Sequence, residues 1–196
     1  PWDGKTAMLF YLLVYVLATV GAFAGLEILE VKGRTVETLD DLRGLARSSD
    51  FDCRFTAWGL AAFMFSLAGV PPLAGFWGKL AVFFSALDIG GSPGENPAKT
   101  RLIMIAVLGA INAAIAAGYY LRVVATLFFA PNEEEPVAGL RPASVGGLLA
   151  MAICLVLTVL IGVMPGRWIH RAHSAGSSIR HALTALPSVP SLTAVD

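Results

Sequence analysis

The chain has 196 residues, of which 56% are hydrophobic and only 14% are charged, and its formal net charge is zero. Because an average soluble domain has about 25% charged residues, this composition excludes an ordinary soluble protein and indicates an integral membrane protein. The balanced charge gives no reason to expect nucleic acid as a partner. The two cysteines, Cys53 and Cys154, predict neither a disulfide framework nor a metal site.

Four apolar runs divide the chain, at about 7–29, 57–87, 102–129 and 145–165. Each run reaches the ~18 residues typical of a membrane-spanning helix. We therefore expect an all-α fold, a polytopic transmembrane helix bundle with four spans, within residues 1–167. The polar tail, 168–196, is rich in Ser, Ala and Pro, and we expect it to be mobile. Because the first residue is Pro1 rather than Met, we expect a part of a longer protein or a processed one.

The first run carries small residues at the three- and four-residue spacings of a helix face, namely Ala18, Gly21, Ala22 and Gly25. Small side chains allow membrane helices to approach one another closely. The first run is therefore expected to pack against other helices along this face. Glu27 and Glu30 close the run, which places them at the membrane interface.

The loop after the first run, 31–55, contains the sequence "TLDD" at 38–41, which has the pattern of a helix capping box. Leu39, Leu42 and Leu45 would fall on one face of a helix that starts there. We therefore predict a short amphipathic helix over 36–47, lying on the membrane surface or against the bundle.

The second run is too long for one straight span and contains two adjacent prolines. A straight helix over 57–87 would be about 46 Å long, whereas the hydrocarbon core of a bilayer is about 30 Å thick. Pro71 and Pro72 lack N–H groups, so the carbonyls of Leu67 and Ala68 lose their helical partners. We therefore predict a discontinuous helix, whose break includes the residues Gly69, Pro71, Pro72 and Gly75. Irregular backbone at membrane depth requires protein or water around it, so the free carbonyls should face a polar interior.

Lys79 follows the predicted break on the second half of this helix. A charged lysine at the centre of a span costs roughly 2.5–3.5 kcal/mol even on the lenient insertion scale. A lysine that lies beside a helix break and near water can gain and release a proton. Lys79 is therefore the main candidate for a proton carrier, and the alternative is a lysine that pairs statically or reaches toward the interface.

Other polar residues are weaker candidates. Arg122 is either a charge partner within the interior or a marker of the end of the third span. Asn112 is either an interhelical hydrogen-bond former or a polar relay. Tyr119 and Tyr120 fit the aromatic belt of a membrane interface. The pair His170 and His173, beyond the last span, has no carboxylate or cysteine companions and does not indicate a metal site.

These segments together resemble a known family. "YLLVYVLATVGAF", "DLRGLAR", "SLAGVPPLAGFWGKLAVF", "YYLRVVATLFFAP" and "GVMPG" occur in this order. The order is similar to that in the last four helices of subunit N of respiratory complex I, the proton-translocating NADH–quinone oxidoreductase. The resemblance covers roughly residues 7–167, and "SLAGVPPLAGFWGK" is its most specific part. Lysine at position 79 favours subunit N, since glutamate there would favour subunit M.

The resemblance implies a proton-translocating membrane subunit in which Lys79 is the proton carrier. It implies no cofactor in this chain, with NADH, flavin, iron–sulfur clusters and quinone held by partner subunits. The partners would be other complex I membrane subunits, the lipid bilayer and protons, in a bacterial inner membrane. It also implies cytoplasmic first and third loops, which agrees with a slight excess of basic residues there.

Two alternatives remain open from the sequence. The chain could be a subunit of a multisubunit cation/proton antiporter or of a membrane-bound hydrogenase, which share this half of the fold. A structural helix bundle with no transport role is the other alternative, and in it Lys79 would pair statically.

Overall fold

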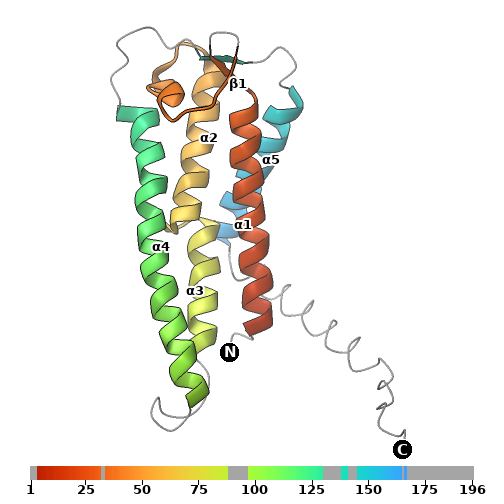
Figure 1. The fold of residues 1–196 in the computed structure, drawn as a ribbon. Helices are drawn as coiled ribbons and strands as arrows, with labels where there is room; N and C mark the ends of the chain where they lie inside the picture. Colours follow the sequence, from red (N-terminus) through yellow and green to blue (C-terminus); the bar gives the residue numbers. More distant parts are fainter. Residues whose placement is uncertain are drawn as a thin grey trace, which may run out of the picture.

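The computed structural model describes residues 4–31, 34–87, 97–129, 138–140, 145–164 and 166. These residues form a bundle of helices that run alongside one another (Figure 1). The helices are α1 (Gly4–Glu27), α2 (Phe51–Ala68), α3 (Ala74–Leu87), α4 (Pro97–Phe129) and α5 (Val145–Val163). In the bundle, α1 packs on α3 and α5, whereas α4 packs on α2 and α3. The expected all-α polytopic bundle is confirmed.

The predicted spans correspond to these helices with one division. Within the described residues, 3 helices are long and apolar enough to cross a membrane, at Gly4–Glu27, Ala98–Phe129 and Val145–Val163. They fall on the first, third and fourth apolar runs. The second run is divided between α2 and α3, which follow one another as one column in Figure 1. That these two helices together form a fourth, interrupted span stays a prediction.

The small residues of the first run pack as the sequence predicts. Ala18, Gly21, Ala22 and Gly25 are all buried. A Cβ atom added to Gly21 would overlap the ring of Phe63 on α2, and one added to Gly25 would lie 3.0 Å from the sulfur of Met151 on α5. Glycine at these positions therefore permits the close approach of α1 to two neighbouring helices.

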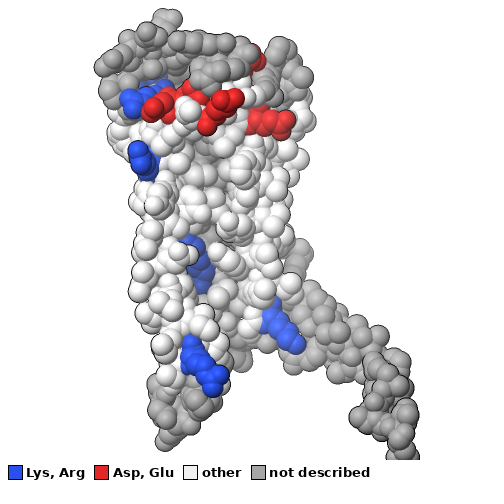
Figure 2. Space-filling model, viewed as in Figure 1, with Lys and Arg blue, Asp and Glu red and all other residues white. Residues whose placement is uncertain are grey.

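A small sheet, which the sequence pattern does not predict, joins two distant loops. Strand β1 (Leu29–Val31) pairs antiparallel with both β2 (Arg34–Thr35) and β3 (Ala138–Leu140), giving the order β2-β1-β3. The pairing of β1 with β3 places the first and third loops at the same end of the bundle. Acidic side chains gather near this end, while the surface along the helices is largely uncharged (Figure 2).

The predicted surface helix over 36–47 is wrong. The structure has two short 3-10 turns there instead, η1 (Asp40–Leu42) and η2 (Leu45–Arg47). Between them Gly44 has a φ of 67°, a left-handed conformation that interrupts a right-handed helix. The Gly44 N–H instead donates to the carbonyl of Thr126 on α4 at 3.1 Å, which ties the loop to the bundle.

Two details of the prediction for this loop are nevertheless confirmed. The carboxylate of Asp41 accepts hydrogen bonds from the N–H groups of Thr38 at 2.9 Å and Glu37 at 3.1 Å, as the acidic residue of a capping box does. Leu42 and Leu45 are buried, so the apolar side of the segment faces the bundle.

Cysteine labelling tests the placement of this loop. Leu42 is 5% exposed, whereas the side chain of Asp40 is 76% exposed. We expect a water-soluble maleimide to label Asp40→Cys quickly and Leu42→Cys slowly in native membranes. The unsubstituted chain is the control, because its own Cys53 and Cys154 are buried. Equal labelling of the two variants would contradict the docked loop.

Candidate functional site

The end of α2 has the geometry of a helix stop. Gly69 has a φ of 92°, the left-handed conformation that favours glycine at a helix C-terminus. Its N–H donates to the carbonyls of Phe65 and Ser66, and the N–H of Val70 donates to that of Phe65. The carbonyls of Leu67 and Ala68, one turn before Pro71 and Pro72, cannot be satisfied in this way because proline has no N–H.

Lys79 supplies the missing donors. Its Nζ donates to the carbonyl oxygen of Leu67 at 2.8 Å and to that of Ala68 at 3.0 Å. The ammonium group also places a positive charge at the C-terminal end of α2, where the helix dipole favours it. The two carbonyls that the sequence predicts to be free are therefore the partners of the half-buried Lys79.

Glycine at position 69 also leaves room for the lysine. A Cβ atom at Gly69 would lie 3.2 Å from Cδ and 3.4 Å from Nζ of Lys79. Any other residue at Gly69 would combine this crowding with an unfavourable left-handed backbone. The break and the position of Lys79 thus depend on the same glycine.

The start of α3 is held by Ser66, a residue that sequence reasoning missed. The buried hydroxyl of Ser66 accepts a hydrogen bond from the N–H of Gly75 at 3.1 Å. This bond satisfies one of the free N–H groups of the first turn of α3. A serine within an apolar run, one turn before the break, was the available signal.

One side of the turn at 69–73 is covered by α5. The indole N–H of Trp77 donates to the carbonyl of Gly162 at 2.9 Å. A Cβ atom at Gly162 would overlap the carbonyl oxygen of Pro72 and lie 2.8 Å from the nitrogen of Ala74. Irregular backbone is thus packed against protein, as it must be at membrane depth.

A cavity of about 380 Å³, open to the surface of the described chain, lies beside Lys79. Its lining comes from α1 (Tyr11, Tyr15), α2 (Leu67), α3 (Lys79, Val82, Phe83) and α4 (Gly109, Asn112, Ala113, Ala116, Tyr120). The structure thus brings Asn112 and Lys79, far apart in sequence, to one cavity. A second, much smaller cavity of about 10 Å³ has Lys79 and Ser66 among its lining residues.

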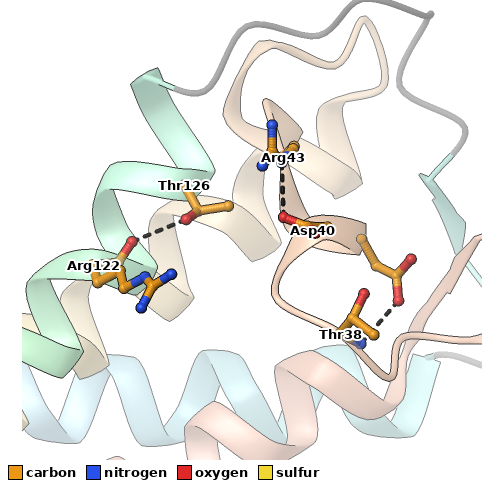
Figure 3. Close-up of polar contacts among 6 residues, drawn as sticks. Thr38, Asp40, Arg43, Arg122 and Thr126 are labelled. Atoms are coloured by element: carbon orange, nitrogen blue, oxygen red, sulfur yellow. Dashed lines mark hydrogen bonds and ion pairs between the residues drawn. The ribbon is translucent and has the colours of Figure 1, made fainter.

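Arg122 lies outside this cavity. It is exposed on α4, about 15 Å along the helix axis from Asn112 at 1.5 Å per residue. Its carbonyl accepts a hydrogen bond from the hydroxyl of Thr126 at 3.0 Å. Figure 3 shows Arg122 beside the loop that carries Asp40 and Arg43. Arg122 is therefore a residue of the loop end of the bundle in this structure.

The described residues contain no group of three or more His, Cys, Asp and Glu side chains that could hold a metal ion. His170 and His173 lie outside the described residues. Cys53 and Cys154 are buried, and neither forms a disulfide bond.

Comparisons with known proteins show what this chain is similar to. Residues 2–92 match the family model described as "NADH:quinone oxidoreductase/Mrp antiporter, TM". NADH-quinone oxidoreductase subunit N of Paramagnetospirillum magneticum is 35% identical over 88% of this chain and 32% of the relative. Subunit N of Geobacter metallireducens is 40% identical over 83% of this chain and 31% of the relative. This chain is a relative of NADH-quinone oxidoreductase subunit N.

The fold supports the same relationship. A chain in the structure of respiratory complex I from Thermus thermophilus with bound aureothin matches with a TM-score of 0.63 and 33% identity. The match covers 84% of this chain and 34% of that chain. The predicted resemblance to subunit N is confirmed, as is a multi-pass membrane protein of bacterial type. The chain spans about a third of the length of the subunit N relatives it matches.

Proposed function

We propose that this chain is part of a proton-translocating membrane subunit of an NADH–quinone oxidoreductase, and that Lys79 carries protons in it. The observation that most directly supports Lys79 as a proton carrier is its placement between two backbone carbonyls and a cavity. The sequence similarity to subunit N supports proton translocation as the function.

The hydrogen bonds of Lys79 allow proton exchange without loss of the helix break. An ammonium group has three donors, and the carbonyls of Leu67 and Ala68 take two of them. The third proton is available to the cavity. When it leaves, the neutral amine still has two N–H groups for the two carbonyls, and its lone pair can accept from water. Both protonation states therefore satisfy the end of α2.

The same bonds reduce the cost of a charge within the membrane. A charged lysine at the centre of a span costs roughly 2.5–3.5 kcal/mol, and a hydrogen bond to a charged group contributes about 1.5–3 kcal/mol. Two such bonds offset the cost of the charged state. A lysine whose charged and neutral states both have hydrogen-bond partners is suited to carry protons. A lysine held in a permanent ion pair is less suited to this role.

The redox chemistry belongs to other subunits in this proposal. NADH, flavin, iron–sulfur clusters and quinone would bind to partner subunits of the same complex. Energy from quinone reduction would reach Lys79 as electrostatic and conformational change. Asn112, which shares the cavity, is proposed as a polar relay, and Arg122 as a charge that acts on the site from the loop end of the bundle.

A cation/proton antiporter is the second candidate function. The matching family model is described for both NADH:quinone oxidoreductases and Mrp antiporters. A proton carrier at Lys79 is compatible with either kind of protein. Purification of the native assembly discriminates between them: quinone-reductase subunits support the first function, and antiporter subunits alone support the second.

The test of the proposal is Lys79→Ala in the intact complex, reconstituted into sealed vesicles. We expect the variant to assemble, because water in the adjacent cavities can take over the two carbonyls. We expect internal acidification on NADH addition to fall by about 100-fold or more, since the positioned proton-transfer group is gone. Lys5→Ala, at an exposed position of α1 outside the cavity, is the matched control. Normal acidification by assembled Lys79→Ala would overturn the proposed role of Lys79.

A further inference from the structure

Helix α3 is held by polar contacts on two opposite sides. Trp77 and Lys79 are two residues apart, so their side chains leave the helix in directions about 200° apart. Lys79 donates to the two carbonyls at the end of α2, and the indole N–H of Trp77 donates to the carbonyl of Gly162 on α5 at 2.9 Å. Each side chain therefore supplies donors to the C-terminal end of a neighbouring helix.

The carbonyl of Gly162 is one that a helix cannot satisfy by itself. The last four carbonyls of an α-helix have no partner within the helix, and α5 ends at Val163. The N–H of Met164 donates to the carbonyl of Leu160 at 3.1 Å, and the indole of Trp77 serves Gly162. The partly buried Trp77 also packs against a buried apolar cluster, which consists of Ala7, Phe10, Val14, Ala74, Ala81 and Ile161. The indole therefore joins α3 to the end of α5 beside an apolar core.

The break between α2 and α3 makes these contacts important for the orientation of α3. In a continuous helix, the hydrogen bonds between successive turns fix the rotation of each segment relative to the preceding one. The turn at 69–73 interrupts this series, so the rotation of α3 about its axis depends on its own contacts. The bond from Gly75 to Ser66 holds its start, and Trp77 and Lys79 hold it on two sides farther along. A rotation of α3 that releases Trp77 would also displace Lys79 from the end of α2.

We propose that Trp77 is a positioning residue, whose bond to Gly162 sets the rotation of α3 at which Lys79 reaches the carbonyls of both Leu67 and Ala68. Without this bond α3 can rotate, and Lys79 loses one or both of its own hydrogen bonds. The balance between the charged and neutral states of Lys79 then changes, because these bonds contribute to it. This inference rests on the proposed function of Lys79, and it connects the proton carrier to the end of α5.

The other titratable side chains that face Lys79 are phenols. Tyr11 and Tyr15 of α1 and Tyr120 of α4 line the same cavity, whereas the lining residue from α2 is Leu67. None of the described residues of α5 lines this cavity. Phenols ordinarily titrate near pH 10, so they stay neutral below about pH 9. Below that pH, a difference between variants in the pH dependence of pumping therefore reports on Lys79.

The test replaces Trp77 with benzothienylalanine in the intact complex, reconstituted into sealed vesicles. This amino acid has the shape of tryptophan but carries sulfur in place of the indole N–H, so it removes the donor and keeps the ring packing. The same replacement at Trp58, which is 63% exposed at the other end of α2, is the matched control. We expect the Trp77 variant to assemble and the pH of half-maximal acidification to shift by about one unit, as expected for loss of one hydrogen bond to a charged group. Trp77→Phe also removes the donor and should shift this pH in the same direction.

The outcomes separate a positioning role from a purely structural one. A shifted pH profile in the assembled Trp77 variants, with an unchanged profile in the Trp58 variant, supports the proposal. An unchanged profile overturns it at any level of assembly, because the bond would then only stabilise the packing of α5. Failure of both Trp77 variants to assemble overturns it for the same reason, and so does an equal shift in the Trp58 variant.

The same measurements distinguish this inference from the proposed function. An unchanged profile in the Trp77 variants, together with loss of pumping in Lys79→Ala, overturns the role of Trp77 and leaves that of Lys79. Normal pumping by assembled Lys79→Ala overturns both.

Discussion

Replacement of Gly75 by alanine is expected to prevent normal accumulation of the protein in the membrane. The added Cβ atom would overlap the carbonyl oxygen of Ser66 and lie 2.6 Å from its carbonyl carbon. These are backbone atoms of α2, so relief requires α3 to move away from α2. That movement would break the hydrogen bond from the Gly75 N–H to the Ser66 hydroxyl.

The expected cost exceeds that of ordinary overpacking. Extra methyl groups in a well-packed core cost about 1–3 kcal/mol when side chains can adjust. At Gly75 the obstacle is backbone, so we expect a loss at or above the upper end of this range, visible as a low level of assembled complex on a native gel.

Gly118→Ala is the matched control for this substitution. Gly118 is an exposed residue of α4, and an added Cβ atom there meets nothing within 4 Å. We expect the control to accumulate like the unsubstituted protein. If Gly75→Ala accumulated equally well, the close contact between the end of α2 and the start of α3 would be contradicted.

Lys79→Arg is expected to have the second large effect, on pumping rather than on assembly. Arginine keeps a positive charge and N–H donors for the carbonyls of Leu67 and Ala68, so the end of α2 stays satisfied. Its longer side chain has room in the cavity that the lysine already lines. However, a guanidinium group does not release its proton at accessible pH. We therefore expect an assembled complex that pumps no better than Lys79→Ala.

The two backbone carbonyls that lack helical partners were the feature of this region most directly readable from the sequence. The absence of an N–H in Pro71 and Pro72 is a covalent fact, and it identifies Leu67 and Ala68 as the carbonyls without partners. What satisfies them was not predictable, because α3 must first pack against α2 before Lys79 can reach back. The role of Ser66 depends on the same packing, and that of Gly162 depends on the packing of α5 against α3.

The loop end of the bundle was predicted less well. Strand β1 pairs with β3 through partners such as Leu29 and Leu140, which are distant in sequence, and strands of three residues have too few positions for a clear alternating pattern. The capping-box pattern at 38–41 favoured a helix, but local propensity was overridden by Gly44, whose N–H bonds to α4. The sequence also left two roles open for Arg122, a charge partner in the interior or a marker of the end of the third span. Its distance from Lys79 depends on how far α4 extends past the cavity, which the sequence does not give.

The different surroundings of Tyr119, which is 68% exposed, and Tyr120, which lines the cavity, could not be read from the sequence either. Adjacent residues of a helix point in directions about 100° apart. Which of the two lines a cavity depends on how α1 and α4 are positioned relative to each other. The apolar runs predict that these helices exist, but the runs contain no signal for the space between them.

The most direct test of proton transfer at Lys79 is the number of protons translocated per electron in sealed vesicles that contain the Lys79→Arg complex. Acidification inside the vesicles and NADH oxidation are recorded together, with the unsubstituted complex and Lys5→Ala measured in parallel. We predict an assembled Lys79→Arg complex whose proton-to-electron ratio is below that of both controls. A ratio equal to that of the controls would contradict it, because a fixed positive charge would then be sufficient at this position.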